Sequence, residues 1–178
     1  PDGTLWELPF QALQPARNRF LIQGCALSYA PSLTVLREMS KPHRAKQAAN
    51  ATLLAFGNPA LGQQTVAQAK MTLMDETFGP LKYAEQQVNQ LATLYGPRRS
   101  HIYTGAEARE DRVKTEAAQH RILHLATHGV LNDTSPLYSH VLLAQAAAPD
   151  GQLQEDGLLE ARELMKLDLN ADMVVLSA

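Results

Sequence analysis

The stretch Ile122-Leu123-His124-Leu125-Ala126-Thr127-His128-Gly129 decides the fold class of this 178-residue chain. It is mostly apolar apart from its two histidines, and it ends in a glycine that breaks the run. Side chains alternate between the two faces of a strand, so the two histidines would share one face. We therefore predict a strand with His128 at its carboxyl end.

On both sides of this stretch, short apolar runs alternate with helix-like segments. Residues 52–56 and 173–176 are further predicted strands, the second with a buried-strand pattern. Between them, residues 81–95 carry apolar side chains at three- and four-residue spacing, and Gly96-Pro97 ends the predicted helix. This alternation predicts an α/β sandwich with a largely parallel sheet.

Smaller elements follow from local signals. Ser32 should cap a helix whose apolar face includes Leu33 and Leu36. Thr104 and Glu107 fit a capping box, which predicts a helix that begins there and turns Ala106 inward. The other expected elements are short extended segments at 20–22 and 26–29, an exposed loop at 40–50, a mobile excursion over 61–80, strands at 102–103 and 141–143, and a helix at 160–167.

Composition limits the classes of partner. Hydrophobic residues make up 45% and charged residues 19%, which is ordinary for one folded domain. The net charge is −2 without a basic patch, so we expect no nucleic-acid partner. No apolar stretch approaches the roughly 18 to 20 residues that cross a bilayer, so we expect no membrane partner. The single cysteine, Cys25, agrees with a reducing compartment, and we expect a cytoplasmic protein.

Both ends of the sequence lead us to expect an excerpt from a longer chain. Pro1-Asp2-Gly3 is typical of a turn that links an upstream strand to the residues after it. At the other end, the strand pattern halts at Ser177-Ala178 without a turn, a cap or a polar tail.

His128 and Gly129 are the candidate catalytic residues. Catalytic groups in open α/β sheets gather at the carboxyl ends of strands, which is where the pattern puts His128. A glycine at 129 lets a substrate carbonyl approach the backbone, and its amide can point into an oxyanion site. A loop histidine exposed at random is the alternative interpretation.

The four-residue spacing of His124 and His128 also suggests zinc. In a helical zinc-hydrolase motif, however, the general-base Glu follows the first His, and here that residue is Leu125. The segment also lacks helix signals, so we predict no metal site and interpret His124 as a packed core histidine.

Other potential nucleophiles lack the partners that would activate them. Cys25 has no base or positive charge nearby in the sequence, which favours a buried structural cysteine. Ser139 lacks the glycine-flanked elbow of serine hydrolases. Asp133 could orient His128 or charge a pocket, although a solvated loop aspartate is favoured. No glycine-rich phosphate motif occurs, and we expect no cofactor.

In their order along the chain, these segments resemble the CHAT domain family, caspase-like modules that are often attached to helical repeats. The resemblance spans nearly the whole chain. It implies a single, partial CHAT domain over residues 1–178, folded as a caspase-like three-layer α/β sandwich. The motifs that carry it are Ile122–Gly129, Pro1–Leu5 with Leu8-Pro9-Phe10, Tyr29-Ala-Pro-Ser32, Phe56-Gly-Asn-Pro59, Tyr103–Ala108, Asp156–Leu164 and Ala171–Ala178.

The resemblance implies a bacterial cysteine endopeptidase that cleaves protein or peptide substrates through a Cys/His dyad. His128 would be the base, and the amides of Gly129 and of the cysteine would form the oxyanion hole. In the family, the catalytic cysteine follows such a Leu-Ser-Ala, directly after Ala178, so the 178-residue chain itself should be inactive. The resemblance also implies an attached helical-repeat or regulatory partner domain.

Three alternatives differ in class. A catalytically inactive CHAT-like module would serve interaction or regulation on the same fold. A metallohydrolase would use His124 and His128, and a flavodoxin-like domain would bind a ligand without giving the histidine stretch a role.

Overall fold

A computed structural model describes residues 5, 8–30, 32–41, 51–72, 77–147 and 153–177. The chain comprises two compact units, Pro1–Lys46 and Gln47–Ala178. The turn predicted at residues 1–3 and most of the loop predicted at 40–50 lie outside the described residues.

The described residues of the amino-terminal unit include the 3-10 turns Phe10–Ala12 and Leu21–Gln23 and helix α1 (Leu33–Met39). The Ser32 hydroxyl accepts a hydrogen bond from the Val35 amide at 3.1 Å, which confirms the predicted cap. The extended segments predicted at 20–22 and 26–29 are wrong, because a 3-10 turn covers the first and no strand forms in the second. The described side chains of this unit are exposed or half-buried.

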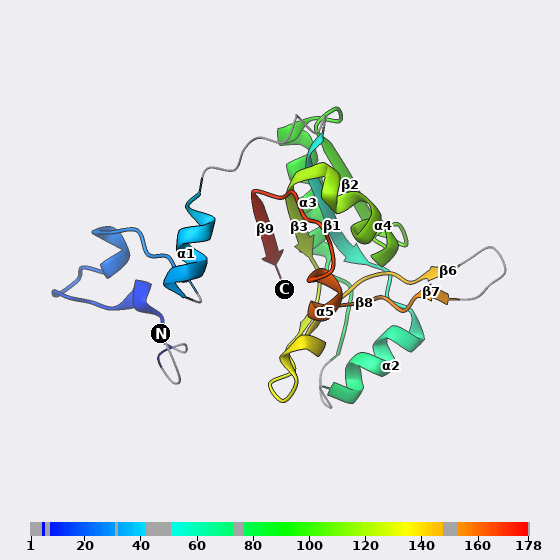
Figure 1. The fold of residues 1–178 in the computed structure, drawn as a ribbon, viewed down its shortest axis with the longest axis horizontal. Coiled ribbons are helices and arrows are strands. Elements are labelled where there is room, and N and C mark those ends of the chain that lie inside the picture. The colour runs from blue at the N-terminus through cyan, green and yellow to red at the C-terminus, as the bar shows by residue number, and fades with distance from the viewer. Residues whose placement is uncertain are drawn as a thin grey trace. The chain divides into compact units, whose positions relative to one another are not determined.

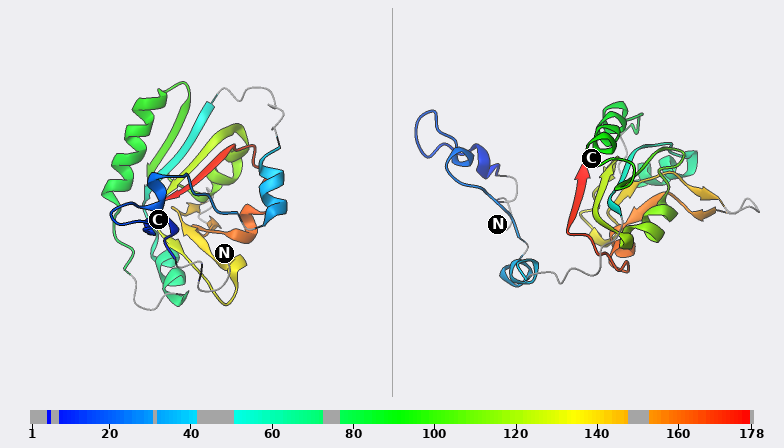
Figure 2. Two further views of the ribbon diagram at one scale, coloured as in Figure 1. Left: turned by 90° about the vertical axis from the view of Figure 1, so that its left-hand side faces the viewer. Right: turned by 90° about the horizontal axis from the view of Figure 1, so that it is seen from above.

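The carboxy-terminal unit is built around a four-stranded parallel sheet (Figures 1 and 2). Its strand order, β2-β1-β3-β9, confirms the largely parallel sheet that the sequence predicts. The strands are β1 (Ala51–Pro59), β2 (Ser100–Gly105), β3 (His120–Ala126) and β9 (Met173–Ser177).

Helices cover both faces of this sheet and complete a three-layer α/β sandwich. Helix α3 (Lys82–Tyr95) packs on one face and α4 (Glu110–Glu116) on the other. Each fully buried Leu or Phe in these layers contributes about 1.5–3 kcal/mol of transfer free energy. The α3 layer buries Leu53, Ala55, Val88 and Ala126, and the α4 layer buries Leu54, Phe56, Val113, Leu123 and Leu125.

A glycine in β1 lets α3 lie close to the sheet. A Cβ on Gly57 would stand 2.7 Å from Val88 Cγ2 and 3.0 Å from the Ala84 carbonyl oxygen. Any larger side chain at this position would force helix and strand apart, because packed cores tolerate little added volume.

Asn58 ties the carboxyl end of β1 to the start of α3. Its Oδ1 accepts the Leu81 amide at 2.7 Å, and its Nδ2 donates to Glu85 Oε2 at 2.7 Å. The predicted turn at 57–59 is therefore part of a longer strand, in which Asn58 adopts a φ of 48°. The Asn58 side chain thereby satisfies the backbone amide of Leu81, the N-cap residue of α3, whose own side chain makes no capping bond.

Residues 63–72 form a helix where the sequence predicts an irregular excursion. Helix α2 (Gln63–Thr72) buries only a narrow stripe, with Thr65 and Ala69 each 0% exposed. The Thr65 hydroxyl donates to the Asp156 carbonyl oxygen at 2.7 Å. Small and polar residues on the buried side give no apolar periodicity, which is why the sequence did not indicate this helix.

The capping box at Thr104 and Glu107 is also wrong. These residues form a turn in which the Glu107 amide donates to the Thr104 carbonyl oxygen at 3.1 Å, and Ala106 is exposed. After this turn, Arg109 forms a bridge with Ala144, and α4 begins only afterwards.

Short antiparallel strands surround the carboxyl edge of the main sheet. Strand β4 (Gly129–Val130) pairs with β5 (His140–Leu142), which also pairs with β8 (Leu158–Glu160). A separate hairpin joins β6 (Ala146–Ala147) to β7 (Leu153–Glu155), and α5 (Ala161–Leu164) follows β8. Short 3-10 turns occur at Ala117–Gln119 and Pro136–Tyr138.

Strand β9 lies at the edge of the sheet and is more exposed than its pattern predicts. The exposed fractions of Met173, Val174 and Leu176 are 50%, 47% and 60%. In the described part of the chain, β9 pairs with β3 alone, and this leaves its outer side uncovered. Among the described helices, none has the length and apolar character needed to cross a membrane.

Candidate active site

The backbone around His128 is held at the junction of three strands. Thr127, which is fully buried, donates its amide to the Ser177 carbonyl oxygen of β9 at 3.1 Å. Its hydroxyl donates to the Leu142 carbonyl oxygen of β5. The Leu142 amide donates in turn to the His128 carbonyl oxygen at 2.9 Å. These bonds fix the position from which the half-buried His128 side chain emerges.

A backbone carbonyl orients the imidazole. His128 Nε2 lies 2.8 Å from the Gly79 carbonyl oxygen, and the Phe78 ring packs edge-on against it, with centroids 5.3 Å apart. A carbonyl oxygen can only accept, so Nε2 carries the proton. In the neutral ring, Nδ1 then keeps its lone pair and is free to act as a base. The sequence did not indicate this contact, because a loop carbonyl has no residue-type signature.

The strands that lead to Thr127 and to Ser177 are neighbours, a point that the sequence leaves open. Strands β3 and β9 run parallel and side by side, with Ala126 paired to Ser177 (Figure 1). If this register continued by two residues, position 179 would face His128, since neighbouring strands lie about 4.8 Å apart. In-register residues of parallel strands point to the same face, which here is the α3 face.

Gly129 is exposed and begins β4 opposite Val141. Hydrogen-bonded and non-hydrogen-bonded pairs alternate along an antiparallel ladder. Because the preceding pair, His128 and Leu142, is hydrogen-bonded, the Gly129 pair is the non-bonded kind. The Gly129 amide therefore points away from β5.

His124 is buried, at 5% exposure, between β1 and β9. Its Nε2 has no hydrogen-bond partner among the described residues, and burial lowers the pKa of the ring. Within the described ranges, no third His, Cys or carboxylate joins His124 and His128 in a metal-binding group. The histidine is packed in the core, as its pattern predicts.

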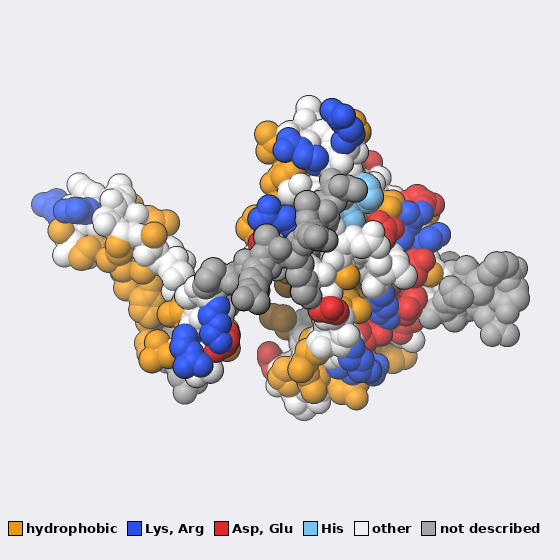
Figure 3. All heavy atoms as spheres, turned by 45° about the horizontal axis from the view of Figure 1, so that its top comes forward, with side chains coloured by type: hydrophobic (Ala, Val, Ile, Leu, Met, Phe, Trp, Pro, Cys, Tyr) orange, Lys and Arg blue, Asp and Glu red, His pale blue; other side chains and the backbone are white. Residues whose placement is uncertain are grey.

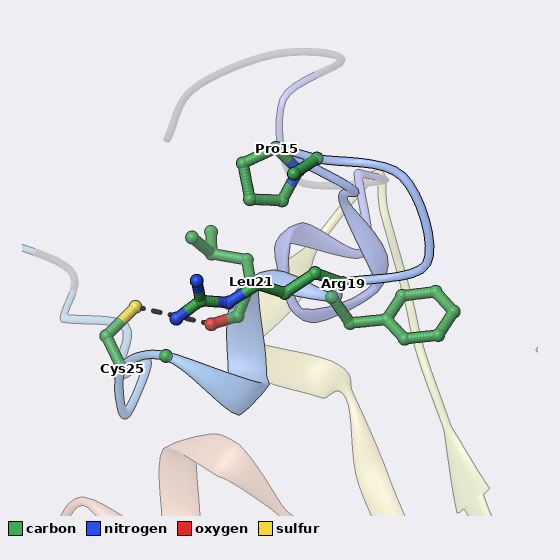
Figure 4. Close-up of a pocket in the computed structure, with 7 residues that line it drawn as sticks. Pro15, Arg19, Leu21 and Cys25 are labelled. Carbon is green, nitrogen blue, oxygen red and sulfur yellow. Dashed lines mark hydrogen bonds between the residues drawn. The ribbon is translucent and has the colours of Figure 1, made fainter.

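Cys25 is exposed, which contradicts the prediction of a buried structural cysteine. Its thiol lies 3.5 Å from the Leu21 carbonyl oxygen, in a hollow of the amino-terminal unit that Pro15 and Arg19 also line (Figure 4). Its small apolar neighbours suggested a core, but the described side chains of this unit do not build one.

The two loop candidates after His128 have different surroundings. The Ser139 hydroxyl accepts the Asn132 amide at 3.0 Å, so it stabilises the loop of the β4–β5 hairpin. Asp133 is exposed on the same loop, and the imidazole of His128 has the Gly79 carbonyl as its partner.

A cluster of charged side chains joins α4 to β7 and α5. Glu110, only 1% exposed, accepts the Gly157 amide at 2.8 Å and lies 2.7 Å from Lys114 Nζ. Burial raises the pKa of Glu110 to about 7. Lys114 also pairs with Glu155 at 2.6 Å and with Glu163 at 2.8 Å. These three carboxylates have metal-ligand spacing, but the ammonium of Lys114 already supplies the cation among them.

Comparison with known proteins places the chain in a family. The model of the CHAT domain family matches residues 1–178. No curated protein matches the chain, and no solved structure does. The family match covers the histidine stretch, the β1 motif and the run into β9, which together build the edge described above. The chain belongs to the CHAT domain family.

Proposed function

We propose that this domain is a caspase-like cysteine endopeptidase module that cleaves protein or peptide substrates through a Cys/His dyad. CHAT domains are caspase-like in general. His128 would be the base, and the nucleophile would be a cysteine directly after Ala178. The parallel register of β3 and β9 supports the proposal, because its continuation would bring that position opposite His128.

In the proposed reaction, the cysteine thiol gives its proton to His128 Nδ1, and the sulfur attacks the scissile carbonyl carbon. The carbonyl π electrons move to oxygen, and the amides of Gly129 and of the cysteine stabilise the resulting oxyanion. The oxyanion then collapses, the C–N bond breaks, and the imidazolium protonates the leaving amine. Water, deprotonated by His128, hydrolyses the thioester and releases the acid product and the thiol.

The contacts of His128 support this role. With Nε2–H bonded to the Gly79 carbonyl oxygen at 2.8 Å, the neutral ring keeps Nδ1 as its basic nitrogen. The same carbonyl would stabilise the imidazolium that forms when the thiol is deprotonated. Loss of one oxyanion donor, such as the Gly129 amide, costs on the order of 100-fold or more in rate.

Activity would depend on the longer chain. We expect a helical-repeat or regulatory partner domain to deliver the substrate or to control access to this edge. An inactive interaction module of the same fold would keep the contacts of His128 but would lack a thiol at position 179.

The first test is to identify the residue after Ala178 in the parent gene and to express the chain extended through it. Peptide cleavage should require both a cysteine there and His128, with His128→Ala lowering kcat by about a hundredfold or more. His101→Ala, at the opposite edge of the sheet, is the matched control and should keep full activity. A different residue at position 179, or cleavage that survives His128→Ala, would overturn the proposal and favour the interaction module.

A further inference from the structure

Asn58 has an uncommon backbone conformation at the carboxyl end of β1. Its φ is 48°, in the left-handed region that few residues other than glycine adopt. The register of β1 against β2 also shifts between Gly57 and Pro59, which leaves Asn58 as the extra residue of a bulge. Bulges redirect single side chains, and backbone conformations of this kind persist where neighbouring contacts hold them.

The bulge turns the Asn58 side chain toward α3. Side chains alternate along a regular strand, so Asn58 would otherwise face the α4 layer as Phe56 does. Instead, its Oδ1 accepts the Leu81 amide and its Nδ2 donates to Glu85 Oε2, each at 2.7 Å. A backbone amide can only donate and an ionised carboxylate can only accept, so these partners require an amide side chain in this orientation. An aspartate here would place a second carboxylate against Glu85.

The hydrogen bond to Leu81 restrains the backbone that contacts His128. The Leu81 amide belongs to the peptide group that follows Pro80. The peptide group before Pro80 supplies the Gly79 carbonyl oxygen, which lies 2.8 Å from His128 Nε2. The proline ring fixes the φ angle between these two peptide groups, so a hydrogen bond to one restrains the other. Among the described residues, a Cβ at Gly79 would meet nothing within 4 Å, so packing at Gly79 itself does not hold the carbonyl.

We propose that Asn58 is a positioning residue that holds the Gly79 carbonyl against the His128 imidazole. With the carbonyl in place, the neutral ring keeps its proton on Nε2 and its lone pair on Nδ1. Without the Asn58 side chain, the carbonyl can move away, and the ring can rotate or carry its proton on Nδ1 instead. The consequence for catalysis rests on the proposed Cys/His function, in which Nδ1 is the base, whereas the tautomer of the ring can be measured without it.

The first measurement is the tautomer of His128, by ¹⁵N NMR of the 178-residue chain at a pH where the ring is neutral. In the parent, Nδ1 should give the signal of an unprotonated imidazole nitrogen. Asn58→Gly removes the side chain but still favours the left-handed backbone, so it should fold and should move this signal toward that of a protonated nitrogen. The His101 side chain is 48% exposed, and histidine side chains reach the surface that Figure 3 shows, so the His128 signal is assigned by its loss in His128→Gln.

A pair of further variants tests the contact between Asn58 and Glu85. Asn58→Asp keeps an acceptor for the Leu81 amide but sets two carboxylates against each other, so it should move the His128 signal as Asn58→Gly does. Adding Glu85→Gln supplies an amide donor in place of the second carboxylate, and the double variant should restore the parent signal. Asn18→Gly is the matched control, because Asn18 also has a positive φ, 57°, but belongs to the amino-terminal unit. It should leave the His128 signal unchanged.

The second measurement is peptide cleavage by the chain extended through a cysteine. There, Asn58→Gly should lower kcat about tenfold with little change in KM, and the double variant should recover most of the loss. A His128 signal that is the same in the parent, Asn58→Gly and Asn58→Asp would overturn the inference, as would full kcat in Asn58→Gly. A signal that moves as expected, in an extended parent that does not cleave peptides, would refute the proposed function and support the hold of Asn58 on His128.

Discussion

The replacement of Gly157 by alanine tests how tightly the turn before β8 is packed. Gly157 has a φ of +82°, and a Cβ there would lie 2.5 Å from the Leu143 carbonyl oxygen and 2.9 Å from Thr65 Oγ1. Its own carbonyl accepts the Leu143 amide at 2.8 Å, and its amide donates to Glu110 at 2.8 Å. The backbone therefore cannot move away from the new methyl group without losing hydrogen bonds.

The cost follows from these contacts. A left-handed conformation costs a non-glycine residue about 1–2 kcal/mol. Relief of the overlap with the Leu143 carbonyl adds about 1–3 kcal/mol of overpacking or lost hydrogen bonding. Gly157→Ala should thus lower the free energy of unfolding by about 3–4 kcal/mol, a large part of the stability of a typical domain. In a chain of this size, that corresponds to about 10 °C in Tm.

Urea denaturation and thermal melting of Gly157→Ala measure this loss. Gly105→Ala is the matched control, because Gly105 has a φ of +56° but its Cβ would meet nothing within 4 Å. It should lose only the conformational cost of about 1–2 kcal/mol. Equal losses in the two variants would refute the claim that crowding at Leu143 and Thr65 requires glycine.

Three further outcomes follow from the described contacts. Between pH 5 and pH 8, the free energy of unfolding of Glu110→Gln, measured by urea titration, should rise by up to about 3 kcal/mol relative to that of the parent, because each pKa unit corresponds to about 1.4 kcal/mol. In the parent protein, the pKa of this carboxyl is raised from 4.5 to about 7, so the stability that its protonated form contributes is present at low pH and is lost as the pH rises through that window. Parallel plots of unfolding free energy against pH for the parent and the variant would contradict this. His124→Leu should reduce the loss of unfolding free energy below pH 6.5, because burial lowers the pKa of His124 and its protonation opposes folding. An unchanged dependence of unfolding free energy on pH below 6.5 would argue against this. In the chain extended by a cysteine, Phe78→Ala should lower kcat about tenfold with little change in KM, since the ring positions His128. Leu61→Ala, which removes packing from the same cluster without touching the imidazole, is its control, and an equal loss of kcat there would contradict a positioning role.

Individual strands and helices could be predicted from the sequence where side-chain patterns were strong. Alternation along 122–129 predicts the burial of β3 and the packing of His124, and the three- and four-residue spacing after Leu81 predicts α3. The adjacency of the strands that lead to Thr127 and to Ser177 is open at the level of the sequence, and the register of β3 and β9 establishes it.

Features set by backbone groups could not be predicted in this way. The Gly79 carbonyl that orients His128 is distant in sequence, and every residue type presents the same carbonyl. The start of α4 was misplaced because the bridge between Arg109 and Ala144 prevails over the local capping signal. His120 Nε2 lies 3.3 Å from His101 Nδ1, a contact that depends on the order of three strands and that neither residue indicates alone.

The close approach of α3 at Gly57 makes the position of this helix depend on the volume of one side chain in β1. The helix begins just after Gly79, and Val88 packs against β1 where Gly57 leaves room for it. A larger side chain at position 57 would displace α3 and with it the segment whose carbonyl binds the His128 imidazole. A substitution in the core of this unit would therefore change the orientation of His128 while leaving every residue around the imidazole intact.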